Sequence, residues 1–118
     1  MSPAEERFVA QTTLLPWLVA EAVCGEAGRA LGTREPYRHA PALAARAVRL
    51  YAVNPPFARR LRARGEGGRE WLCAFLRHWL AAALQRTTPH LARALPSGFA
   101  LGAPTGGTCH FARGPAGV

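Results

Sequence analysis

The longest run with a regular helical pattern of apolar and polar residues lies at positions 69–86 (REWLCAFLRHWLAAALQR). At about 100° per residue, Glu70, Arg77 and Gln85 fall on one narrow face, and the large apolar side chains share the rest. This apolar arc is wider than the stripe of an ordinary surface helix, so we expect the helix to lie at the centre of the fold. Its members are Leu72, Phe75, Leu76, Trp79, Leu80, Ala83 and Leu84, with Trp71 at the edge.

Two helices are expected before position 33. Ser2, Pro3 and Glu5 are ordered as in a capping box with proline at the first helical position, which predicts a helix from there to about position 13. Pro16 cannot lie inside a helix without loss of a hydrogen bond, so we expect a break near 14–15 and a restart with Pro16 in the first turn. Trp17 lies off the main apolar face of this second helix and marks a candidate contact patch.

Glycines and prolines predict where the next segments begin and end. Gly25 and the glycines after it predict that the second helix frays from Gly25 and is over by Gly32. The polar stretch 33–40 is expected to be a connection, because Pro36 disfavours helix at the residue before it. A helix is then expected over 41–53, and Asn54 is expected to cap another over 55–64.

The chain after position 86 changes character. Thr88 is positioned to cap a short helix that Pro89 begins and that ends at 96–98. From Phe99 onward the chain is rich in glycine and proline and has no period, so we expect a flexible tail in which Phe99 and Leu101 dock on the core. The prediction is an all-α fold with a helical domain over 1–98, built from four to six helices around 69–86, and a tail over 99–118.

Composition adds a strong positive charge to this picture. The chain has 15 basic residues, all arginine, and 7 acidic residues, all glutamate, which give a formal net charge of +8. GC-rich coding bias accounts for arginine in place of lysine, but not for the shortage of acids. An anionic partner is therefore expected.

The helix expected over 55–64 is the best candidate for contact with that partner. Together with 41–53 it has the outline of a helix-turn-helix, although its Asn-Pro-Pro turn is unusual for that motif. Its arginines surround the helix, which favours phosphate contact without sequence reading. The simpler interpretation is a solvated surface helix. The candidate nucleic-acid-binding residues are Arg59, Arg60, Arg62, Arg64, Arg46 and Arg49.

The leading hypothesis is therefore a non-enzymatic protein that contacts nucleic acid. The alternative is an adaptor or inhibitor that binds an acidic protein, or a homodimerising module. Other functions have weaker support in the sequence. Trp71 and Trp79 have the spacing of core residues and not of a base-stacking platform. The chain has no aspartate, no nucleophile motif and no phosphate loop, so we expect no enzyme activity and no cofactor.

Metal binding and membrane insertion are not expected either. Cys73 and His78 are five residues apart, a poor spacing for a shared metal site, and Cys109-His110 lies in the expected tail. Three cysteines in a chain without a signal segment favour free thiols. No apolar run approaches the roughly 18 residues of a membrane span, so a cytoplasmic protein is expected.

Overall fold

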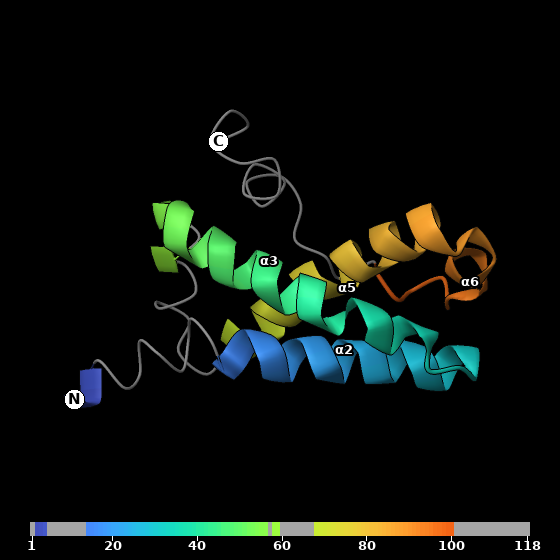
Figure 1. Cartoon of the computed structure of the whole chain (residues 1–118), viewed down its shortest axis with the longest axis horizontal. Coiled ribbons are helices and arrows are strands. Elements are labelled where there is room, and N and C mark those ends of the chain that lie inside the picture. Colours follow the sequence, from blue (N-terminus) through green and yellow to red (C-terminus); the bar gives the residue numbers. More distant parts are fainter. Residues whose placement is uncertain (1, 5–13, 57, 60–67, 101–118) are drawn as a thin grey trace.

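The body of the fold is formed by α2 (Leu15–Leu31), α3 (Ala40–Val53) and α5 (Gly68–Thr87) in a computed structural model (Figure 1). The 3-10 helix η2 (Glu35–His39) joins α2 to α3, and the short helix α6 (Pro89–Ala94) follows α5. The structure describes residues 2–4, 14–56, 58–59 and 68–100. Over these residues the fold is all-α, as predicted. Helices α2 and α3 run antiparallel, α5 crosses α3 obliquely in this view, and α2 contacts both.

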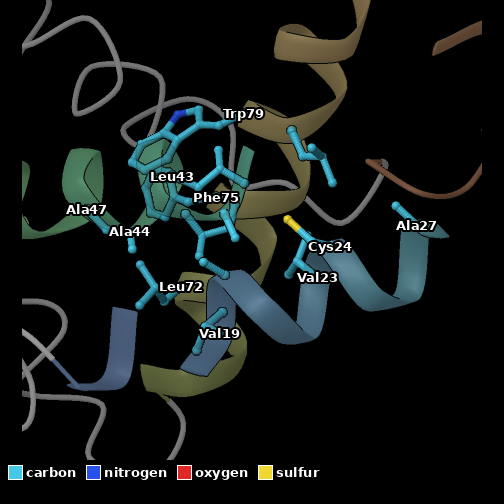
Figure 2. Packing of buried hydrophobic residues seen from close by; sticks show 14 of the residues in the cluster. Val19, Val23, Cys24, Ala27, Leu43, Ala44, Ala47, Leu72, Phe75 and Trp79 are labelled. Carbon is cyan, nitrogen blue, oxygen red and sulfur yellow. The ribbon is translucent and has the colours of Figure 1, made fainter. Parts of the chain in front are cut away.

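Helix α5 lies at the centre of the core, as its wide apolar face predicts. One leucine per turn is fully buried, and the rings of Phe75 and Trp79 fill the space between α5 and α3 (Figure 2). Trp71 and Trp79 are 8% and 2% exposed, which confirms that both are core residues. Because each buried leucine contributes roughly 1.5–3 kcal/mol, this face supplies much of the driving force for folding. The fully buried leucines are Leu72, Leu76, Leu80 and Leu84.

Helix α2 begins where the sequence predicts a break. Leu14 is the N-cap residue and Pro16 lies in the first turn, where its missing N–H is harmless. The helix then buries Val19, Val23 and other small residues against α3 and α5. Of the helix expected over 2–13, only residues 2–4 belong to the described part of the chain.

The prediction that α2 frays from Gly25 is wrong, because α2 continues to Leu31. A Cβ atom at Gly25 would lie 2.8 Å from the Tyr37 hydroxyl, and one at Gly28 would lie 2.8 Å from the Thr33 carbonyl oxygen. These two glycines therefore let the following segment pack directly on the helix. The helix ends at Gly32, which has a φ of 71°, and the Thr33 N–H donates to the Gly28 carbonyl at 3.1 Å as in a Schellman motif.

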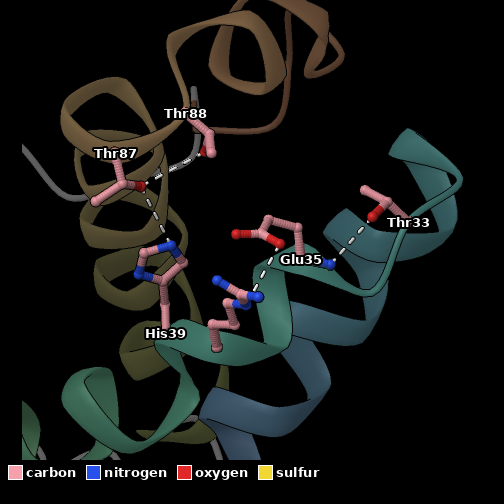
Figure 3. Close-up of polar contacts among 6 residues, drawn as sticks. Thr33, Glu35, His39, Thr87 and Thr88 are labelled. Carbon is pink, nitrogen blue, oxygen red and sulfur yellow. Dashed lines mark hydrogen bonds and ion pairs between the residues drawn. The ribbon is translucent and has the colours of Figure 1, made fainter.

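The expected connection over 33–40 contains regular structure. Pro36 is buried in the first turn of η2, for which its fixed φ is well suited, and the Tyr37 N–H donates to the Arg34 carbonyl at 3.0 Å. The Glu35 N–H donates to the Thr33 hydroxyl oxygen at 3.2 Å (Figure 3). The connection is thus a 3-10 helix that holds Tyr37 against α2.

The predicted ends of the later helices are mostly confirmed. Asn54 ends α3, and the Ala58 N–H donates to its carbonyl at 3.1 Å in the helical residues that follow. Thr88 is the N-cap residue of α6, but its side chain makes no capping hydrogen bond. Phe99 is buried against the core as expected. Leu101 and the rest of the expected tail lie outside the described residues, so the boundary at 98 stays a prediction.

Among the helices that the structure describes, none combines the length and the apolar character that crossing a bilayer requires.

Candidate anion-binding cluster

The predicted site residues divide into two groups. Arg46 and Arg49 lie one turn apart on α3, and Arg59 is exposed in the helical residues after Asn54. Three further predicted residues fall outside the described part of the chain, and their placement on a helix stays a prediction. These are Arg60, Arg62 and Arg64.

Arg46 is held in place by the aromatic core. Its guanidinium carbon lies 4.2 Å from the centroid of the Trp79 ring, and Trp79 itself is 2% exposed. Stacking of this kind contributes about 0.5–1 kcal/mol at exposed sites and more where water is excluded. Because Trp79 is fixed by packing, the planar guanidinium above it has a defined position at the surface.

Arg86 in the last turn of α5 joins this group, although no sequence pattern marks it as a candidate. Burial lowers the pKa of Arg46 below its usual range, and the charges of Arg86 and Arg49 lower it further. These three arginines, Arg46, Arg49 and Arg86, are called the Arg46 cluster below. The spacing of Arg86 in the chain gives no hint of this, because only the packing of α5 near α3 brings it there.

The Arg46 cluster has no acidic partner among the described residues. The ion pairs of this part of the chain join Arg38 to Glu35 and Arg77 to Glu26. Neither pair includes a member of the cluster. The arginines of the cluster repel one another in the free protein, and an anion that binds between them relieves this repulsion.

His39 lies at the edge of the Arg46 cluster. Its Nε2 is 3.5 Å from the Thr87 hydroxyl oxygen, next to Arg86 in sequence (Figure 3). Burial lowers the pKa of His39, the Glu35 carboxylate raises it, and the charges of Arg86 and Arg38 lower it again. The imidazole is therefore mostly neutral at pH 7 and adds no charge to the cluster at that pH.

A hollow of about 230 Å³ lies between α2 and α5, away from the Arg46 cluster. It is lined by Val19, Ala22, Arg69, Glu70, Cys73 and Arg77. Burial raises the pKa of the Cys73 thiol, and no histidine lines the hollow to activate it. Within the described ranges, no three His, Cys or Glu side chains come together to form a metal site.

Comparison of the chain with protein families, with curated proteins and with solved structures finds no match.

Proposed function

We propose that this protein is a non-enzymatic binding protein whose Arg46 cluster contacts the phosphates of a nucleic acid. The observation that carries the proposal is the placement of three arginines in one region without an acidic partner among the described residues, one of them stacked on a buried tryptophan. Arginine presents a planar fork of N–H donors that matches phosphate oxygens. The cluster thus offers several preformed contacts to a chain of regularly spaced anions.

The geometry favours contact with the backbone over contact with bases. Trp79 is covered by Arg46 and by the core, so its ring has no free face on which a base can stack. The members of the cluster come from two different helices and from no single reading face. Binding should therefore be insensitive to sequence and steeply dependent on salt, as phosphate contacts are.

The proposal extends to the arginines that follow α3. Arg59 is exposed, and Arg60, Arg62 and Arg64 follow it in the sequence. These four charges add to the affinity for a polyanion such as a nucleic acid, which contacts many cations at once, whereas a single phosphate contacts few.

The experiment measures binding of the full chain to labelled random duplex and single-stranded oligonucleotides by fluorescence anisotropy. Measurements at about 50 and about 200 mM salt give the slope of log affinity against log salt. The double variant Arg49→Ala/Arg86→Ala removes two exposed cluster charges and should flatten this slope by about 1.8 for duplex DNA. Weaker binding at both salt concentrations should accompany the flatter slope.

The matched control is Arg69→Ala/Arg93→Ala, which removes the same charge from exposed positions outside the cluster. It should retain most of the binding and of the slope. Equal losses in the two double variants would show that only net charge counts. Retention on heparin without binding to either oligonucleotide would favour the acidic protein partner, and no binding at low salt would refute the proposal.

A further variant tests the role of the stacked guanidinium. Arg46→Lys keeps the charge but removes the flat group that lies over Trp79. We expect its affinity to fall towards that of Arg46→Ala, because an ammonium group is not held in one place by the ring. Full retention of binding in Arg46→Lys would show that charge alone is needed at this position.

A further inference from the structure

One face of α2 is not used by the core and carries three exposed apolar side chains at its start. Leu14, Trp17 and Leu18 are 59%, 44% and 55% exposed. Trp17 and Leu18 follow Leu14 by three and four residues, so the three side chains project from one side of the helix as a ridge, called the α2 ridge below. Solvent exposure of an apolar group this large is typical of a surface that contacts another protein.

The same side of α2 carries a hollow at its other end. The spacing that joins the α2 ridge continues through Glu21 to Gly25, Gly28 and Gly32. These three glycines line a hollow of about 260 Å³ together with Arg29, Thr33, Arg34 and Tyr37, and it is called the Tyr37 hollow below. Gly32 has no atom within 4 Å of a Cβ position, so the hollow is open there.

The Tyr37 hollow has the chemistry that an aromatic or aliphatic side chain requires. Its open floor is the helix backbone at Gly32, and one wall is Tyr37, which packs on Gly25. The Arg34 guanidinium carbon lies 4.8 Å from the centroid of that ring, and Arg29 borders the other side. An indole in this hollow would lie beside an aromatic ring and two cations, both of which attract its π face.

The ridge and the hollow are placed so that two copies of the chain match each other. Their centres are about thirteen residues apart, or roughly 20 Å along the helix at about 1.5 Å per residue. When a second copy of α2 is laid antiparallel on the first, each ridge meets the other copy's hollow in the same arrangement. A two-fold axis then passes between the ridge and the hollow, close to Ala22 and Val23.

We propose that this protein forms a homodimer through antiparallel pairing of α2, in which the α2 ridge of each copy enters the Tyr37 hollow of the other. This interface is isologous and closes after two copies. The proposal is independent of the nucleic-acid proposal, because no member of the Arg46 cluster belongs to α2.

Opposite charges on the two copies of α2 also come within reach of each other in this pairing. The two Glu21 side chains lie near the two-fold axis and repel each other, and Arg29 of the partner copy, about five residues or roughly 7.5 Å further along the facing helix, offsets this repulsion. An arginine side chain reaches that far, so each carboxylate has a cation in range. The other α2 glutamate, Glu26, keeps its pair with Arg77 of its own chain and takes no part in the proposed contact.

The small size of the proposed interface is typical of a weak dimer. Helix α2 has 17 residues and is about 25 Å long, whereas an interface of standard size buries about 800 Å² on each partner. One helix face and the adjoining Tyr37 supply less than that. The dimer should therefore be weak, with dissociation in the micromolar range.

The first experiment is sedimentation equilibrium of the full chain from about 1 to about 200 µM, the range in which a weak interface associates. The weight-average mass should rise from the 12.7 kDa of one chain towards twice that value. Trp17→Ala/Leu18→Ala should stay monomeric over the same range. Val53→Ser is the matched control, because Val53 is 62% exposed on α3, outside the proposed interface, and its removal should leave the rise unchanged.

The second experiment tests the pairing of ridge with hollow. Arg29→Glu/Arg34→Glu changes two exposed residues of the Tyr37 hollow, leaves the α2 ridge intact, and should also be monomeric. When the two monomeric variants are mixed, one intact ridge meets one intact hollow. The mixture should associate measurably more than either variant alone, with circular dichroism showing that both variants are folded.

Three results would overturn the proposal. A constant monomer mass up to the highest concentration would exclude the dimer. A dimer that is lost in Trp17→Ala/Leu18→Ala but unaffected by Arg29→Glu/Arg34→Glu would indicate contact of ridge with ridge. A dimer that both double variants retain would place the interface elsewhere in the molecule.

Discussion

Arg46 and Arg77 are both partly buried arginines on long helices, yet their surroundings are opposite. Arg77 donates to both carboxylate oxygens of Glu26, at 2.9 to 3.2 Å, and this hydrogen bonding raises its pKa. Arg46 lies over an aromatic ring, near Arg49 and Arg86, and burial lowers its pKa. One cation is neutralised within the fold, whereas the other has no acidic partner among the described residues.

This difference separates a structural arginine from a candidate binding residue. The Arg77–Glu26 pair joins α5 to α2 and has little left to offer a ligand, because the Glu26 carboxylate already neutralises the charge of Arg77. The Arg46 cluster retains its repulsion in the free protein, so an anion gains affinity by relieving it. Net charge alone does not make this distinction, since both arginines count equally towards +8.

The largest expected effect concerns α5, the helix that carries both Arg77 and the Trp79 ring on which Arg46 stacks. Within α5, the fully buried Leu76 directly precedes Arg77 in the sequence. Leu76→Ala should lower the free energy of unfolding by about 2–5 kcal/mol, because it leaves a cavity in the core. Urea denaturation measures this loss, with exposed Gln85→Ala as the control, which should change stability by less than about 0.5 kcal/mol. A loss under about 1 kcal/mol for Leu76→Ala would show that α5 is not the centre of the core.

The next effect is the removal of the carboxylate that neutralises Arg77. The side chains of the pair are 34% and 42% exposed, so solvent screens their attraction. Glu26→Gln should therefore cost no more than about 1 kcal/mol of stability. Glu35→Gln is the matched control, because its pair with Arg38 is a single 3.4 Å contact on a far more exposed arginine. If Glu26→Gln proved no more destabilising than Glu35→Gln, the Arg77 pair would not be a structural link.

How far the sequence predicts this contrast depends on whether the contacts are local. The apolar period of 69–86 and the position of Pro16 predict α5 and the start of α2 correctly, because they depend on neighbours within a few turns. The sequence marks Arg46 and Arg49 as candidates through their charge alone. Their neighbour Arg86 and the stacking on Trp79 come from helices far apart in the chain, and no local pattern contains that information.

The glycines of α2 show the same limit of local sequence patterns, here in predicting the stability of a helix. Propensity predicts that Gly25 and Gly28 weaken the helix, and in isolation they would. Within the fold, Tyr37 and Thr33 approach so closely that a Cβ at either glycine would collide with them. Tertiary packing thus outweighs the local preference, and the contact that does so lies beyond the end of the helix.

A substitution in the Arg46 cluster is expected to have a smaller effect on stability, and one of opposite sign. Arg86→Gln removes one of the like charges near Arg46, so it should leave stability unchanged or raise it by up to about 0.5 kcal/mol. The same change should weaken oligonucleotide binding, as expected where a site is optimised for function at the expense of stability. Thermal unfolding and anisotropy on the same preparation measure both. A clear loss of stability in Arg86→Gln would show that this arginine has a structural partner and does not belong to a binding cluster.

The smallest effect is a pH dependence carried by His39 at the edge of the cluster. Its pKa is below the ordinary value of 6.5 in the folded protein, so the unfolded chain binds the proton more readily. Stability from this group is fully present above about pH 6.5 and is lost as the pH falls from there through the folded pKa. Urea unfolding in a buffer without phosphate, from about pH 7.5 to about pH 5, should show the wild-type chain losing stability relative to His39→Gln. Added oligonucleotide should reduce this difference, because an anion bound beside Arg86 favours the charged imidazole. Parallel stability curves for the two proteins without ligand would show that His39 titrates as it does in the unfolded chain, and would separate it from the cluster.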